Sequence, residues 1–288
     1  MLIMVALGIY SILAEYLLSA MVEAGHFSAP VVYYSESRSF YSFYLAFTVI
    51  KNGYFRNYGI FREPGLYQFF LLLALYLNNY AMNWKKEWQL WTVNGILAAT
   101  MLTTFSTIGV AAMGLFAVVL FFDRKLYQNK RFLRIMIVCA MVGIILLTVV
   151  IFRQGSLYRT LRTMVIKLFV INDSSGSRYE AIFKNIQFFL QHPLLGAGFK
   201  ETLYAVKHNT SSTLFLYAVY GFAGGTLNVL AWAALIWEKE RKLWLNLLLL
   251  MTMIMAVNTQ NFTTDVFFWL FPTMALVERG IRLVEKKQ

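Results

Sequence analysis

The sequence is poor in charged residues. Only 14% of its 288 residues are Asp, Glu, Lys or Arg, whereas 59% are hydrophobic and 17% are aromatic. An ordinary soluble domain contains roughly 25% charged residues. A chain with so few lacks the polar surface that a water-soluble fold needs. The shortage of charge argues strongly against a soluble globular protein and predicts a membrane protein.

Other absences narrow the function. The single cysteine, Cys139, excludes an intramolecular disulfide. The sequence has no Walker loop, no G-x-G-x-x-G, no H-E-x-x-H and no C-x-x-C motif. The linkers carry no cluster of carboxylates, so a nucleotide sugar held through Mg²⁺ is not the expected donor. We therefore expect neither a metal site nor a cofactor.

Apolar stretches of about 16–20 residues, close to the thickness of a bilayer core, dominate the chain. We predict an all-α fold: a polytopic bundle of about eight spans that forms a single membrane-embedded domain over residues 1–288. The glycines at 221, 224 and 225 predict a bend in the sixth span. The predicted spans are 2–22, 66–82, 88–105, 107–122, 134–152, 210–237, 243–257 and 266–277.

The net charge of +12 follows the membrane topology, so no nucleic-acid partner is expected. Four short segments hold 14 of the 26 Lys and Arg residues. They are 83–88, 123–134, 238–242 and the tail 278–288. The short linkers 105–107 and 258–265 hold none. This bias predicts a multi-pass protein of the bacterial cytoplasmic membrane with both termini in the cytoplasm.

Two long segments, about 23–65 and 153–208, are then external. Residues 39–51 are apolar but too short for a confident crossing, and we interpret them as an interfacial helix. The segment 153–208 has a net charge of +5, which fits attraction to anionic lipid headgroups. Arginine also grips phosphate oxygens in pairs. A bound lipid pyrophosphate is the sharper interpretation, with Arg153, Arg159, Arg162 and Lys207 as candidate contacts.

An amphipathic helix is predicted over Arg178–Leu190, with N-cap serines at 174, 175 and 177 and a stop at His192–Pro193. Arg178 would lie in the first helical turn, where the dipole disfavours a cation unless an anion binds there. The alternative is an arginine that faces solvent.

Two further residues are candidates for the same site. His208, followed by Asn209, stands at the outer edge of the sixth span. It could act as a general base or donate to a phosphate, or it could simply be satisfied by a backbone carbonyl. Arg62 precedes the second span and could join Arg178 and His208, although it could instead pair with Glu63.

Three motifs resemble the family of O-antigen ligases and polysaccharide polymerases. Arg178 is followed by "HPLLGAG" (192–198), "HN" (208–209) and "YGFAGG" (220–225). "GIFREPGLYQFFLLLALYL" (59–77) is similar to the entry to a span in exopolysaccharide polymerases, and "TTFSTIGVAAMGL" (103–115) is similar to a hairpin between two spans. Family members usually have more spans than eight, so the resemblance implies a short version or a chain lacking the family's first helices.

The resemblance implies a metal-independent glycosyltransferase that uses a glycan on undecaprenyl pyrophosphate at the outer leaflet. It assigns Arg178, Arg62 and His208 catalytic roles: the arginines hold the pyrophosphate, and the histidine takes the acceptor's proton or holds the leaving phosphate. Its partners would be a flippase and a chain-length regulator. "EPGLYQFF" (63–70) favours a polymerase over a ligase.

Two alternatives from other classes remain open. A transporter of the same lipid-linked glycan would need polar residues inside several spans, and Glu15 is the main one. A non-catalytic scaffold in a polysaccharide assembly complex is the other.

Overall fold

The computed structural model divides the chain into two compact units, one of residues 1–114 and 125–170, the other of residues 115–124 and 171–288. The structure describes residues 2–13, 31–35, 38–42, 47–51, 54–61, 63–153, 158, 162, 173–206, 209 and 211–285. Side chains are described for most of these residues.

In its described residues, the first unit contains four long helices and a small sheet. The helices are α1 (Leu2–Leu13), α3 (Pro64–Tyr80), α4 (Glu87–Thr103) and α6 (Lys130–Arg153). They are joined by the start of α5 (Thr107–Asp123) and the short helix η2 (Leu126–Gln128). The sheet is antiparallel, in the order β1 (Val31–Ser35), β2 (Arg38–Ser42), β3 (Phe47–Lys51) and β4 (Tyr54–Asn57).

The sheet corrects two expectations. Residues 39–51 do not form an interfacial helix, because β2 and β3 pair there from Arg38↔Lys51 to Ser42↔Phe47. Aromatic and β-branched residues such as those of "SFYS" and "FTVIK" fit a pleated strand better than a helix. The fold is therefore mainly helical but not purely so.

Small residues set the helix contacts of the first unit. A Cβ at Gly8 of α1 would lie 2.6 Å from Thr100 Oγ1 of α4, and a Cβ at Gly109 of α5 would lie 2.2 Å from Gln68 Oε1 of α3. Glycine lets the helix backbones approach closely at both points. Polar groups at one end of this packing are bonded together: Ser11 contacts Tyr67 Oη at 3.0 Å and accepts from Asn57 Nδ2 at 2.9 Å.

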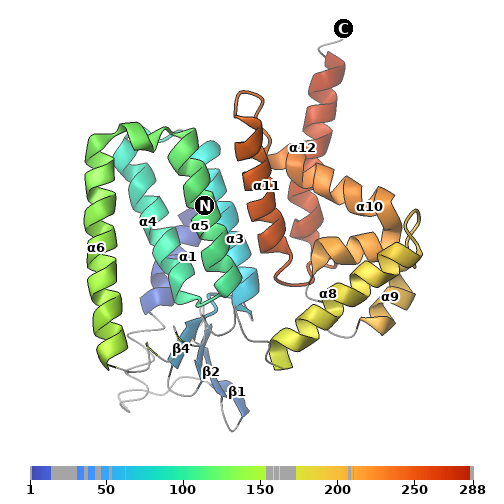
Figure 1. Ribbon diagram of the computed structural model, residues 1–288, viewed down its shortest axis with the longest axis horizontal. Helices are drawn as coiled ribbons and strands as arrows, with labels where there is room; N and C mark the ends of the chain where they lie inside the picture. The colour runs from blue at the N-terminus through green and yellow to red at the C-terminus, as the bar shows by residue number, and fades with distance from the viewer. Residues whose placement is uncertain are drawn as a thin grey trace. The chain divides into compact units, whose positions relative to one another are not determined.

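The second unit is centred on α10 (Ser212–Ile236), which packs against α8 (Asp173–Gln191), α9 (Phe199–Ala205), α11 (Leu243–Val257) and α12 (Val266–Glu285). Figure 1 shows α10 as two straight pieces that meet at a sharp bend. The break lies at Gly221, whose φ of 65° and ψ of −159° are not helical. The predicted bend in the sixth span is confirmed.

A helix lies in each predicted span, and where the structure describes both ends they lie close to the expected ones, except that α12 continues to Glu285, eight residues beyond the predicted end of the last span at 277. The seventh span coincides with α11, and the first is described only to Leu13. Among the described residues, α10 is the one helix long and apolar enough to cross a membrane by length and composition. Helices α1, α5 and α11 are apolar but shorter. The crossing of a membrane by about eight helices remains a prediction.

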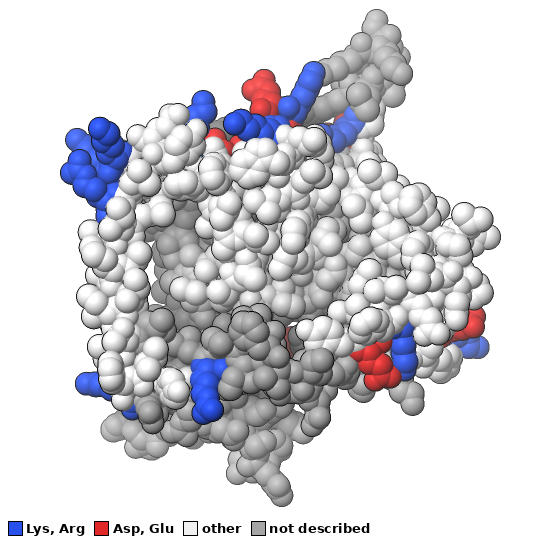
Figure 2. All heavy atoms as spheres, viewed as in Figure 1, with Lys and Arg blue, Asp and Glu red and all other residues white. Residues whose placement is uncertain are grey.

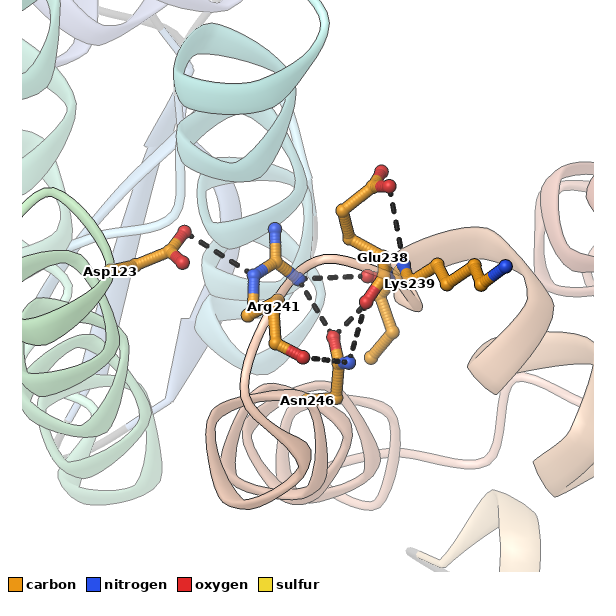
Figure 3. A network of polar contacts seen from close by, with 6 residues as sticks. Asp123, Glu238, Lys239, Arg241 and Asn246 are labelled. Atoms are coloured by element: carbon orange, nitrogen blue, oxygen red, sulfur yellow. Dashed lines mark hydrogen bonds and ion pairs between the residues drawn. The ribbon is translucent and has the colours of Figure 1, made fainter.

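A charged network closes the linker between α10 and α11 (Figure 3). Arg241 Nε donates to Asp123 Oδ2 at 3.2 Å, and Arg241 Nη1 donates to Ile236 O and Asn246 Oδ1 at 3.0 and 3.1 Å. Asn246 Nδ2 in turn donates to Glu238 O at 2.8 Å. Only 5% of the Arg241 side chain is exposed. This linker cation therefore has a packing role besides its expected contribution to topology.

Candidate functional site

The structure describes only part of the predicted site. Arg62, Arg159, Lys207 and His208 lie outside the described residues. Arg153, at the end of α6, and Arg162 are exposed. For Arg178 the structure gives the helical backbone alone, and Asn209 is described with its side chain. The meeting of Arg62, Arg178 and His208 therefore stays a prediction.

Helix α8 carries Arg178 further from its start than predicted. Residues 173–178 already lie in the helix, so serines 174, 175 and 177 are helical residues rather than N-caps. Arg178 is the sixth residue of α8 and does not lie in its first turn, which removes the argument that an anion is held by Arg178 together with the helix N-terminus. The predicted end is confirmed, because α8 ends at Gln191, just before His192 and Pro193.

Helical spacing relates position 178 to two buried residues of α8. Ala181 is 3% exposed and Asn185 is 0% exposed. Residues three and seven positions further along an α-helix share a face with the first. The backbone at position 178 therefore lies on the same side of the helix axis as Ala181 and Asn185, about 10 Å along the axis from Asn185.

Asn185 connects this face to the segment that follows His208. Its Nδ2 donates to Asn209 Oδ1 at 3.0 Å, and the backbone N–H of Ser211 donates to the same oxygen at 3.1 Å. The second bond makes an Asx-type turn that fixes the chain just before α10. One side chain of α8 thus holds the residue next to His208.

The turn between α11 and α12 supports the same segment from the other side. Asn258 Oδ1 accepts from Ser211 Oγ at 2.8 Å and from the Thr213 backbone N–H at 2.9 Å. Ser212 Oγ donates to Gln260 O at 2.7 Å and accepts from the Phe262 N–H at 2.8 Å. The Thr213 N–H is one of the backbone donors that the start of a helix leaves unpaired, and the other bonds use the hydroxyls of Ser211 and Ser212. They make the start of α10 a well-anchored point.

The acidic residue of that turn is Asp265. Burial raises the pKa of its carboxyl above the ordinary 3.8. Ionised Asp265 is therefore less favourable in the folded chain than in the unfolded one, and its contribution to folded stability falls as pH rises through the folded pKa. The hydrogen bonds that anchor α10 at this turn come from neutral amide, hydroxyl and backbone groups.

Two of the motif segments contact each other in the folded chain. The break at Gly221 leaves backbone groups of α10 without helical partners, and the segment 193–198 bonds to them. Ala197 N donates to Ala218 O at 2.8 Å and Gly198 N to Val219 O at 3.1 Å, while Phe222 N donates to Pro193 O at 2.7 Å. The loop replaces the hydrogen bonds that the bend removes, which a buried backbone requires.

Glycine is required on both sides of this junction. Gly196 and Gly221 have φ of 74° and 65°, a conformation that costs other residues free energy. A Cβ at Gly196 would lie 2.2 Å from Val219 O, and one at Gly221 would lie 2.4 Å from Leu194 O. The "HPLLGAG" and "YGFAGG" segments are therefore two halves of one backbone junction.

Sequence reasoning missed Asn185 and Asn258 as supports of this region. A helical-face count from Arg178 would have found Asn185, because it is the polar residue on the otherwise apolar buried face. Nothing local marks the role of Asn258, since the residues that it holds at the start of α10 lie 45–47 positions away. Within the described parts of the chain, no group of three or more His, Cys, Asp or Glu residues could hold a metal ion.

Comparison with protein families gives one match. Residues 92–225 match the family model described as O-antigen ligase. No curated protein and no solved structure is similar enough to be matched. The matched region runs from α4 to the bend in α10 and contains Arg178, Asn209 and the Gly196–Gly221 junction. The predicted resemblance to O-antigen ligases is thereby confirmed over residues 92–225.

Proposed function

We propose that the protein is a polysaccharide polymerase that joins undecaprenyl-pyrophosphate-linked repeat units at the outer face of the cytoplasmic membrane. O-antigen ligase-type proteins are membrane enzymes of the glycosyltransferase kind, which is the coarser function that the family match carries. The assignment as a polymerase rather than a ligase rests on the motif "EPGLYQFF" (63–70). This motif lies at the start of α3, outside the matched region.

The bond between Asn185 and Asn209 is the observation that carries the proposal. It ties the face of α8 that includes position 178 to the residue that follows His208. The two residues with the strongest predicted roles thus stand on segments that are bonded to each other, and Arg62 joins them by resemblance alone.

The reaction that we propose is a substitution at the anomeric carbon of the donor sugar. An acceptor hydroxyl forms the new C–O bond, the bond from that carbon to the pyrophosphate oxygen breaks, and undecaprenyl pyrophosphate leaves with the bonding electron pair. His208 takes the hydroxyl proton or holds the leaving phosphate. Arg178 and Arg62 stabilise the negative charge that builds on the pyrophosphate, with Arg153, Arg159, Arg162 and Lys207 as further contacts.

The membrane placement is part of the proposal. Helix α6 exposes apolar side chains along its length, including Ile137, Met141, Ile144 and Ile151, between Lys130 and Arg153. In Figure 2 its surface is white between blue ends. Its 24 residues reach about 36 Å along the axis, and we propose that this helix crosses the bilayer in addition to α10. In intact cells, the thiol of Ser175→Cys in a Cys139→Ser background should react with an impermeant reagent. Protection of that thiol would mean that residue 175 is not external and that the predicted membrane topology is inverted.

The experiment for the activity compares Arg178→Lys with a matched control on the same helix. Lys184 forms an exposed ion pair with Glu180 at 2.7 Å, so Lys184→Ala should leave activity near that of the wild type. Arg178→Lys should lose most of it, because lysine cannot form the two-pronged contact with phosphate. Polymer length and yield from purified lipid-linked repeats are the readout. Normal polymer from Arg178→Lys would remove Arg178 from the mechanism.

A ligase is the second candidate, since the matched family model carries that description. The same assay separates the two activities. If lipid-linked repeats alone are extended into longer chains, the protein is a polymerase. If glycan transfer occurs only after a different acceptor lipid is added, the protein is a ligase and the polymerase assignment is wrong.

A further inference from the structure

The two asparagines that join α8 to the start of α10 leave one amide atom each unpaired. Oδ1 of Asn185 and Nδ2 of Asn209 are buried and have no hydrogen-bond partner. Leaving a buried polar atom unpaired costs about 1–3 kcal/mol, and folded proteins contain few such atoms. Gln68 and Asn228 also have unpaired amides. Among the described residues, only Asn185 and Asn209 combine an unpaired acceptor and an unpaired donor on side chains that already touch.

The hydrogen bonds fix which atoms are free. A backbone N–H can only donate, so the Asn209 atom that faces Ser211 N must be the oxygen. Its Nδ2 is then the free donor. The same oxygen accepts from Asn185, which must therefore present Nδ2 to it and keep Oδ1 as the free acceptor. We call these two side chains the open amide pair.

The pair lies at the edge of the interior of the second unit. Asn185 is 0% exposed, whereas Asn209 is partly exposed, so the pair runs from the interior of the second unit towards its surface. Asn258 and Ser211 hold the segment at Asn209 in place. The pair is thus anchored before any ligand arrives, which lowers the entropic cost of binding.

We propose that the open amide pair binds a neutral group of the glycan that both donates and accepts a hydrogen bond, namely a hydroxyl or an acetamido group. The group donates to Asn185 Oδ1 and accepts from Asn209 Nδ2. An ionised phosphate has no proton to donate, so it cannot satisfy Asn185. The inference rests on the proposed function and assigns the pair to the sugar rather than the pyrophosphate part of the substrate.

Asn209→Asp is the sharpest variant for this test. An aspartate keeps an oxygen that accepts from both Ser211 N and Asn185 Nδ2, and it replaces only the free donor by an acceptor. Asn83→Asp places the same charge on an exposed residue of the first unit and serves as the control. Asn209→Ser, which removes the amide without adding charge, covers the case in which the aspartate variant does not fold.

The measurement is saturation-transfer-difference NMR on the full chain in detergent, with N-acetylglucosamine and glucose as probes, and 31P line broadening for inorganic pyrophosphate, which has no protons to observe. We expect saturable binding of N-acetylglucosamine alone if the group is acetamido, and of both sugars if it is hydroxyl. In Asn209→Asp the Kd for the sugar should rise roughly three- to tenfold, with pyrophosphate binding and the Asn83→Asp control unchanged.

Two results would overturn the inference: no saturable transfer to either sugar in the wild type, or an unchanged sugar Kd in both Asn209 variants. Equal weakening of sugar and pyrophosphate binding would likewise assign the pair to the whole substrate and contradict a sugar site. The binding experiment measures no turnover. If the chain binds the sugar but fails the polymer assay, the proposed function is rejected and the sugar site is kept.

Discussion

Two asparagine pairs of this chain make different use of the same side chain. In the first unit, Asn79 Nδ2 donates to Asn94 Oδ1 at 2.8 Å and Asn94 Nδ2 donates back to Asn79 Oδ1 at 3.1 Å. In the second unit, Asn185 donates to Asn209 at 3.0 Å, and neither remaining amide atom is paired. The first pair is closed and the second is open.

The surroundings explain the difference. Asn78 Nδ2 also donates to Asn94 Oδ1, and Trp84 Nε1 donates to Asn78 Oδ1, so the closed pair belongs to a network between α3 and α4. The Asn209 oxygen is instead shared with the Ser211 backbone N–H, which orients the amide for the turn before α10. A polar pair whose bonds are complete stabilises helix packing, whereas one with a free donor and acceptor is available to a ligand.

The largest expected effect is on the backbone junction of the second unit, the unit that contains the open pair. Gly221→Ala places a Cβ 2.4 Å from Leu194 O in a left-handed conformation and should destabilise the second unit by about 1–3 kcal/mol from backbone strain alone. A large fall in Tm in detergent is the expected result. Gly95→Ala in α4, where nothing lies within 4 Å, should raise Tm slightly. Equal Tm values for the two variants would contradict the requirement for glycine at position 221 of the junction.

A smaller effect should come from the closed pair. Asn94→Asp removes the donor to Asn79 Oδ1 and buries a carboxylate, at a cost of about 1–3 kcal/mol. Tm should fall, and the NMR affinity of the sugar probe for the folded protein should stay unchanged. A weakened sugar affinity in this variant would mean that the two pairs are not separate in function.

The smallest effect on stability should come from Asn209→Asp. Both hydrogen bonds to the Asn209 oxygen survive this change, and the residue is partly exposed. We expect its Tm to fall less than that of Asn94→Asp, as measured in the same thermal scan. The opposite order would indicate that the open pair serves packing and would weaken the case for a ligand.

The sequence predicted the helices well because apolar length and helix-breaking residues are local signals. The Pro193 stop, the Gly221 bend and the extent of α11 all depend on neighbouring residues. The sheet was missed because alternating aromatic residues also suit an interfacial helix, and pairing such as Arg38↔Lys51 is not local. Helix α9 was missed because its seven residues are too few for a periodic pattern.

The candidate site was predicted only in part. The segments that matter were chosen correctly, since "HPLLGAG" and "YGFAGG" meet at one junction and Asn209 is held in place. The serine caps were placed wrongly because Ser and Asp favour both a cap and a first turn, and the choice depends on where the helix starts. Asn258 needed the folded chain, because hydrogen bonds that span 45 to 47 positions leave no pattern in the sequence, whereas the helical spacing from Arg178 could have singled out Asn185.

The junction at Gly221 also bears on how the chain is made. Residues 193–198, which supply partners for the broken backbone of α10, are synthesised before residues 218–222. The second half of α10 therefore emerges when the segment that completes its hydrogen bonds is already present, and the two can assemble in the order of synthesis. A circular permutation that placed 193–198 after α10 would keep every contact and lose that order.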